Sequence, residues 1–274
     1  MDEDALVTEA RARVAAGARE IVLTGVHLGK YRFDSGGSER DLVGLCRRIL
    51  EIDGVWRLRF SSILSDHLTD EVLEFIAGEP RVCRHLHVPL QSGDDGVLTA
   101  MNRPYTIDAF VERVNATQDA LEGIALATDV IVGFPGETEE AFSATLDVVE
   151  EIGFSKLHVF RYSERAGTAA VEMGGEVSPD VKKERSRRLI DLGNTIRARF
   201  LAAHLDRPLQ VLVEDERAAH GDDGAGRVCS GQTDDYVRVW FDGEGLLGSL
   251  VEVRGGEIRA DGIRGGQVTE VLRR

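Results

Sequence analysis

Small polar residues and glycines follow five apolar segments of the 274-residue sequence, and such residues bind polar ligands. They are Thr24-Gly25-Val26-His27, Ser61-Ser62, Gln91-Ser92, Gly133 to Thr138, and Tyr162 to Thr168. The carboxyl ends of parallel barrel strands share one face, so we expect these residues to line one polar pocket. The Gly133-x-x-Gly136 spacing fits neither a Walker loop nor a dinucleotide fingerprint, which argues against a nucleoside triphosphate site.

Asp129 and several histidines are the titratable candidates of this pocket. Asp129 lies inside an apolar segment, where an unpaired carboxylate is costly, so we expect an internal arginine or a polar ligand group as its partner. His85 and His87 alternate on one strand face and could ligate a metal ion together. Since no third ligand has suitable spacing, core or pocket histidines are the favoured interpretation, and His27 and His158 have the same status.

Alternation of short apolar segments with amphipathic segments predicts an α/β fold with parallel strands. The predicted strands are Glu20 to Thr24, Trp56 to Phe60, His85 to Leu90, Ile124 to Val132 and Lys156 to Tyr162. The predicted helices are 3–16, 39–52, 69–78, 106–121, 138–151 and a last one from Pro179 to Leu205. Thr69, Thr106 and Thr138, each followed by acidic residues, are the expected helix caps.

The pattern changes after Pro208 to short strands separated by glycine and aspartate, namely LQVLVE, YVRVWF, SLVEV and QVTEVL, with a Gly- and Asp-rich loop from Ala218 to Gly226. These strands predict a small antiparallel barrel of the oligonucleotide-binding type. The expected domains are therefore 1–204 and 205–274.

Composition excludes several protein classes. No apolar run is long enough to span a membrane, and three widely spaced cysteines fit a reducing compartment, so we expect a cytoplasmic protein. The net charge of −15 repels nucleic acid, so any RNA contact must come from local patches. In the last helix, a cluster of basic residues that includes Arg185 and Arg188 is either a salt-bridged face, the favoured interpretation, or an RNA track. In the acidic C-terminal domain, RNA binding would depend on Tyr236, Arg238 and Trp240.

Five segments, read together, resemble the radical-SAM methylthiotransferases in order and spacing. They are LTGVHLGKY, RLRFSSI, HLHVPLQSGDDGVLTAMNRPYT, TDVIVGFPGETEEAF and KLHVFRYSERAGTAA. The element TGVHLGKY is similar to the branch that methylthiolates N6-threonylcarbamoyladenosine at position 37, in the anticodon loop of tRNA. The segment after residue 205 resembles the RNA-binding TRAM domain of that family.

The resemblance implies a partial parallel (βα)6 radical-SAM barrel that binds S-adenosyl-L-methionine against a [4Fe-4S] cluster. It implies that Thr24, Gly25, Val26 and His27 face the methionyl part of the cofactor. Ser61, Ser62, Gln91 and Ser92 would face the ribose or carboxylate, and Asp129, Gly133 and Phe160 the adenosine.

The family's cluster is bound by a C-x-x-x-C-x-x-C loop after the first barrel strand, and this sequence contains no such motif. We expect that the first strand, the loop and an N-terminal portion are missing, and that Cys46, Cys83 and Cys229 do not replace the ligands. The chain alone is then expected to be inactive. Four other readings stay open: a non-catalytic RNA-binding remnant, a methylthiotransferase of isopentenyladenosine in tRNA, one of a ribosomal-protein aspartate, and an unrelated parallel-barrel enzyme.

Overall fold

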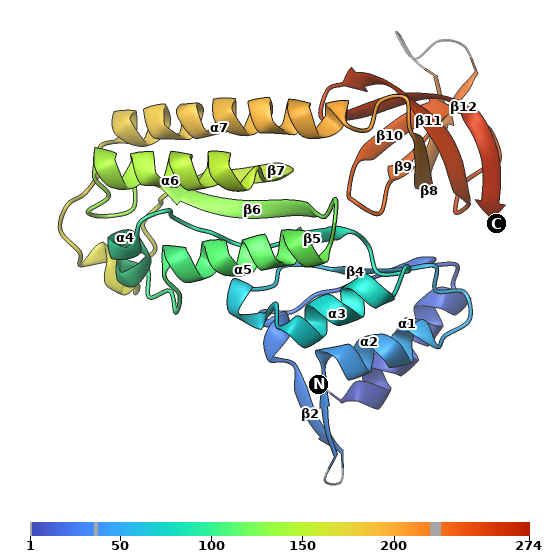
Figure 1. The fold of residues 1–274 in the computed structure, drawn as a ribbon, viewed down its shortest axis with the longest axis horizontal. Coiled ribbons are helices and arrows are strands. Elements are labelled where there is room, and N and C mark those ends of the chain that lie inside the picture. Colours follow the sequence, from blue (N-terminus) through green and yellow to red (C-terminus); the bar gives the residue numbers. More distant parts are fainter. Residues whose placement is uncertain (1, 36–37, 220–225) are drawn as a thin grey trace. The chain divides into compact units, whose positions relative to one another are not determined.

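The computed structural model describes residues 2–35, 38–219 and 226–274 (Figure 1). By their contacts these residues form two compact units. The first unit combines residues 1–61, 75–85 and 198–274, and the second combines residues 62–74 and 86–197. The side chains of residues 33–40 are not described.

Two parallel strands, β1 (Glu20–Leu23) and β4 (Arg57–Phe60), lie in the first unit as predicted. The helices α1 (Glu3–Ala15) and α2 (Leu42–Leu50) pack against each other there. The prediction of a helix over 39–52 is wrong at its start, because β2 (Arg32–Ser35) and β3 (Ser38–Asp41) form an antiparallel hairpin there. Asp41 then caps α2 by accepting a hydrogen bond from the Gly44 amide, which fixes the first helical residue at Leu42.

The second unit contains a three-stranded sheet in the order β5-β6-β7, with β5 (His85–His87) beginning at the last residue of the first unit. The strands β6 (Ala125–Val132) and β7 (Lys156–Arg161) are parallel, as predicted. The strand β5 is shorter than expected, although Val88 and Gln91 still donate backbone hydrogen bonds to β6. Its helices are α4 (Asp95–Ala100), α5 (Ile107–Ala120), α6 (Glu139–Ile152) and most of α3 (Asp70–Gly78) and α7 (Pro179–Ala202).

The threonine caps are confirmed, because Thr69, Thr106 and Thr138 each accept a backbone hydrogen bond at the start of their helix. The helix α4 was not predicted, and it is capped by Asp94. Short 3-10 turns complete the fold at η1 (Leu28–Lys30), η2 (Ser65–His67) and η3 (Ala169–Val171).

The C-terminal strands close into a barrel, as predicted, in the order β10-β12-β11-β8-β9 and back to β10. The strands are β8 (Pro208–Ala218), β9 (Arg227–Gln232), β10 (Arg238–Asp242), β11 (Leu250–Arg259) and β12 (Gly262–Arg273). Two details were wrong: β9 was not predicted, and the β10–β12 pair is parallel, so the barrel is not fully antiparallel. Of the predicted Gly- and Asp-rich loop, residues 220–225 lie outside the described residues.

Two buried arginines of β4 attach the barrel within the first unit. Arg57 donates to the backbone oxygens of Gln232 and Gln210, at 2.9 and 2.7 Å. Arg59 donates to the backbone oxygens of Asp234 and Thr233 and forms an ion pair with Glu20 at 2.6 Å. These hydrogen bonds satisfy two guanidinium groups that would otherwise be costly to bury.

Among the described residues, no helix has the length and apolar character needed to cross a bilayer.

Candidate functional site

The residues that follow β1 in the first unit are open to solvent. Thr24, Gly25, Val26 and His27 follow β1 and are all exposed, and the Val26 side chain is 97% exposed. Ser61 is half-buried after β4, and its amide donates to the Leu23 oxygen at 2.9 Å. An exposed apolar side chain next to polar groups provides surface that a ligand can cover.

Gln91 and Ser92 follow β5 in the second unit and are buried. Gln91 has a φ of 67°, a region that residues other than glycine seldom adopt. Its amide donates to the Asp129 oxygen and its own oxygen accepts from the Ile131 amide, so β6 holds this backbone in place. Ser92 is fully buried, and its hydroxyl accepts from the Asp94 amide at 3.3 Å. Ser62, by contrast, is half-buried and pairs with β5 at His87.

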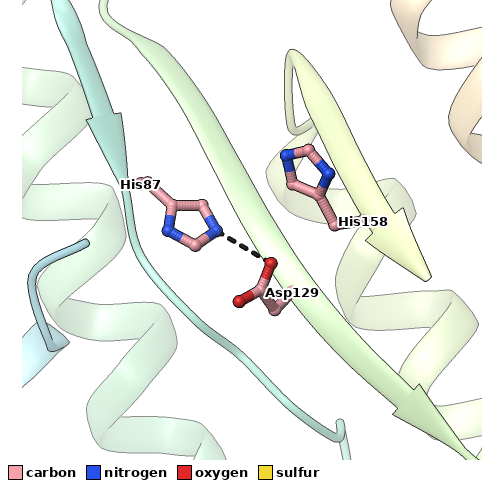
Figure 2. A group of neighbouring side chains, drawn as sticks. All are labelled: His87, Asp129 and His158. Carbon is pink, nitrogen blue, oxygen red and sulfur yellow. Dashed lines mark hydrogen bonds and ion pairs between the residues drawn. The ribbon is translucent and has the colours of Figure 1, made fainter. Parts of the chain in front are cut away.

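Asp129 has a hydrogen-bond partner within the protein that was not predicted from the sequence. His87 Nε2 lies 3.0 Å from Asp129 Oδ1, and the partner is therefore a histidine rather than an arginine (Figure 2). His158 lies beside Asp129 on β7, and its ring packs edge-on against His87 with centroids 5.8 Å apart. Burial lowers the pKa of His158, which favours its neutral form. His85 instead stacks on Tyr236 in the first unit.

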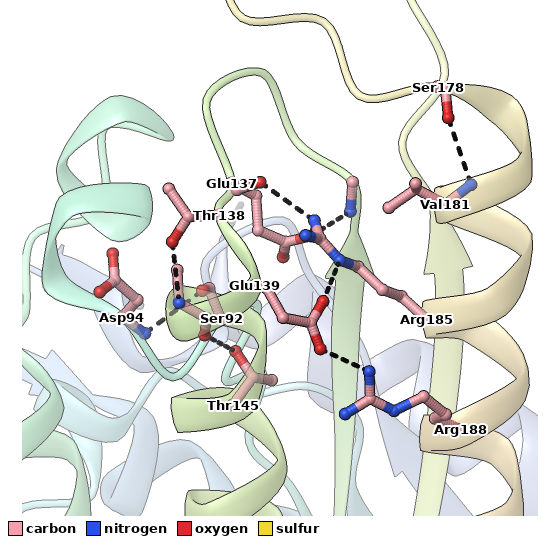
Figure 3. A network of polar contacts seen from close by, with 12 residues as sticks. Ser92, Asp94, Glu137, Thr138, Glu139, Thr145, Ser178, Val181, Arg185 and Arg188 are labelled. Carbon is pink, nitrogen blue, oxygen red and sulfur yellow. Dashed lines mark hydrogen bonds and ion pairs between the residues drawn. The ribbon is translucent and has the colours of Figure 1, made fainter.

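The loop after β6 is fixed by a buried ion pair between Glu137 and Arg185 of α7 (Figure 3). Arg185 Nη1 lies 2.7 Å from Glu137 Oε2, which also accepts from the Gly133 amide at 2.7 Å. The side chains are 6% and 1% exposed, and burial raises the pKa of Glu137 despite these partners. Gly133 has a φ of 74°, so a larger residue would strain this turn. The candidate cofactor residue Gly133 is thus held by a network that reaches α7.

Phe160, the last predicted cofactor residue, lies on β7 and is 51% exposed. It alternates along the strand with Val159, so it is on the same strand face as exposed His158.

The three cysteines lie in core packing rather than in a shared site. Cys46 is buried within α2, Cys229 lies in the core of the C-terminal barrel, and Cys83 has its thiol 3.7 Å from Glu20 Oε2. Burial raises the pKa of all three thiols, to about 12 for Cys83 and about 11 for Cys229. In the described part of the chain, no three cysteines come together as cluster ligands would.

The residues predicted to bind RNA differ in their burial and in the protein partners that they already have. Arg185 is buried in the ion pair with Glu137, so its guanidinium already has protein partners. Arg188 is partly exposed and pairs with Glu139 at 2.5 Å. Arg185 and Arg188 therefore form ion pairs within the protein, in agreement with the favoured interpretation of a salt-bridged helix face. Tyr236 stacks on His85 at 4.7 Å and lies under Arg59.

Tyr236 is nevertheless 44% exposed, whereas Arg238 and Trp240 are half-buried on β10, where they alternate with the fully buried Val239 and Phe241. The Arg238 guanidinium carbon is 5.9 Å from the Trp240 ring centroid, and Arg238 Nη2 donates to Ser230 Oγ on β9 at 2.9 Å. An arginine beside an aromatic ring on one barrel face is an arrangement that suits stacking on bases.

Comparison with known proteins supports a radical-SAM assignment. Residues 1–149 match the Radical SAM superfamily. The chain is 39% identical over 258 residues to threonylcarbamoyladenosine tRNA methylthiotransferase MtaB of Bacillus subtilis, covering 92% of this chain and 55% of the relative. It is 40% identical over 268 residues to tRNA-2-methylthio-N(6)-dimethylallyladenosine synthase of Sorangium cellulosum, covering 91% of this chain and 54% of the relative. The chain thus spans about half the length of these relatives.

Among solved structures, the coproporphyrinogen III oxidase HemN of Escherichia coli, described as a radical SAM enzyme, matches with a TM-score of 0.55 at 18% identity. The match covers 70% of this chain and 45% of that one, and it supports the fold alone. With the parallel strands and the strand-end residues described above, the matches give one conclusion. The chain belongs to the radical SAM superfamily and, within it, to the methylthiotransferase family.

Proposed function

We propose that this chain is the cofactor- and RNA-binding part of a tRNA methylthiotransferase that converts N6-threonylcarbamoyladenosine at position 37 to its 2-methylthio derivative. The observation that carries the proposal is identity of 39% to the Bacillus subtilis relative across 92% of the chain. Relatives named for dimethylallyladenosine are equally similar, so the TGVHLGKY element after β1 is what favours the threonylcarbamoyl substrate. We also place the protein in the cytoplasm, where tRNA is modified.

The strand-end residues suit S-adenosyl-L-methionine. In the first unit these are Thr24, Gly25, Val26, His27 and Ser61. In the second unit they are Ser62, Gln91, Ser92 and Gly133, and the strands β6 and β7 add Asp129 and Phe160. The exposed Val26 and Phe160 offer apolar surface. The backbone of Gln91 is held by two hydrogen bonds to β6, so this residue has a fixed position. The cofactor would supply the radical and the methyl group, and within each unit these residues have the chemistry to bind and orient it.

A [4Fe-4S] cluster does not fit the cysteines of this chain, because they are buried in separate packing environments. We propose that the cluster ligands, the first barrel strand and an N-terminal portion belong to sequence outside these 274 residues. The present chain would then bind its ligands without cleaving the cofactor. A non-catalytic RNA-binding protein is the second candidate, and the same arrangement of the cysteines favours it.

We divide the chain into a radical-SAM core over 1–204 and a TRAM domain over 205–274 that holds the tRNA. Support comes from the closed barrel of β8 to β12 and from the half-buried pair Arg238 and Trp240 at its surface. The barrel carries 14 acidic residues against 9 arginines, so local stacking rather than its overall charge has to provide affinity.

Replacing Trp240 with alanine is expected to weaken tRNA binding by roughly 5- to 150-fold, since one base stacked on an aromatic side chain contributes about 1–3 kcal/mol. Equilibrium binding of an anticodon stem-loop, followed by fluorescence anisotropy at fixed salt, measures the change. Leu247→Ala is the control, because Leu247 is an exposed residue of the same barrel outside β10. Equal affinity of Trp240→Ala and the unmodified chain would argue against an RNA-binding face at β10.

The activity and the substrate are tested by mass spectrometry of tRNA nucleosides, after this chain has been completed with the part of the Bacillus subtilis relative that the match leaves uncovered.

A further inference from the structure

Three potential metal ligands meet on neighbouring strands of the second unit. His87 lies on β5, Asp129 on β6 and His158 on β7 (Figure 2). One ligand atom from each side chain lies within 4.8 Å of the other two. The sequence offered only the His85 and His87 pair, and it gave no third ligand because Asp129 and His158 are distant along the chain.

The spacing of these atoms is close to that of a bound ion. A zinc ion with ligand bonds of about 2.0–2.1 Å places neighbouring ligand atoms roughly 3.4 Å apart. His87 Nε2 and Asp129 Oδ1 are 3.0 Å apart in a hydrogen bond. A bound ion would replace the proton that they share, which passes to water, and only His158 has to approach. Since His158 is exposed, rotation of its side chain can bring its ring nitrogen closer without disturbing the core.

Charge and access also favour a cation. Two imidazole rings and one carboxylate are side chains that commonly ligate divalent transition metals. The side chains of His87 and Asp129 are 18% and 27% exposed, so an ion can reach them. Strands hold all three residues, and such rigid elements preorganise a metal site.

We propose that His87, Asp129 and His158 bind one divalent transition-metal ion, with zinc as the best match to two imidazoles and one carboxylate. Three protein ligands leave at least one coordination position open for water or a small ligand. The inference does not rest on the proposed function. Because Asp129 is also proposed to contact S-adenosyl-L-methionine, metal and cofactor should compete.

The test is a titration of the purified full chain with Co²⁺, whose visible absorption reports ligand number and geometry. We expect a saturable band at one equivalent of Co²⁺ that added Zn²⁺ removes. His158→Ala should weaken Co²⁺ binding by at least about tenfold. Asp129→Asn, which keeps the side-chain shape, should do the same if His158→Ala proves unstable. His67→Ala, a half-buried histidine outside the group, is the control and should bind as the unmodified chain does.

Absence of a saturable band, or identical titrations for the unmodified chain and both site variants, would overturn the metal site. S-adenosyl-L-methionine should weaken Co²⁺ binding if both ligands share Asp129. Unchanged Co²⁺ binding in its presence would leave the metal site standing and would count against the proposed cofactor contact.

Discussion

Replacing Arg185 with methionine is expected to destabilise the second unit by about 3–5 kcal/mol, because the substitution leaves the Glu137 carboxylate buried without its charge partner. The loss includes two hydrogen bonds from Arg185 Nη1 to Glu137 and the contact of the guanidinium with the Phe142 ring. Urea unfolding followed by circular dichroism measures the change in free energy.

Two further variants separate the buried pair from helix effects. Arg187→Met changes an exposed arginine of the same helix, whose ion pairs lie in solvent, so its effect should be hardly measurable. The double variant Glu137→Leu with Arg185→Met removes both charges and should recover much of the stability. If the single variant Arg185→Met unfolds at the same urea concentration as Arg187→Met, the ion pair does not anchor the loop after β6.

The isolated chain is expected to form no 5'-deoxyadenosine when it is incubated anaerobically with iron, sulfide, a reductant and S-adenosyl-L-methionine. Cys46, Cys83 and Cys229 are buried in separate places, and their raised pKa values disfavour the thiolates that bind iron. Liquid chromatography with mass spectrometry detects the product, and iron analysis of the desalted protein reports the cluster.

A cluster-containing radical-SAM enzyme treated in the same way is the positive control for this experiment. Four irons per chain together with catalytic amounts of 5'-deoxyadenosine would show that these cysteines do converge. The proposal that the ligands lie outside the chain would then be wrong.

The parallel strands and most helices of the first 200 residues could be predicted, because apolar segments and threonine caps are local signals. The hairpin β2–β3 was missed because its second strand, Ser38–Asp41, ends at the residue that caps α2. Its polar residues therefore look like the beginning of the helix. The strand β9 was missed because Arg227–Gln232 contains serine and glycine, which rarely mark a strand. Its pairing partners β8 and β10 supply the stability that its own residues lack.

The candidate site could be predicted only in part, because contacts between distant residues leave no local pattern. Arg57 and Arg59 alternate in a predicted strand, yet the backbone oxygens that satisfy them follow 153 to 175 residues later. The partner of Asp129 was expected to be an arginine or a ligand, whereas the neighbouring strand supplies His87. Similarly, nothing near Arg185 in the sequence indicates that its guanidinium forms a buried ion pair with Glu137.

The most direct test of the account is nucleoside analysis of tRNA from cells that lack their own 2-methylthio modification. These cells would express either this chain alone or the chain completed with the uncovered part of the Bacillus subtilis relative. We expect 2-methylthio-N6-threonylcarbamoyladenosine with the completed protein and none with the chain alone. A completed protein that is folded, binds iron and leaves threonylcarbamoyladenosine unchanged, or modifies isopentenyladenosine instead, would contradict the proposed function.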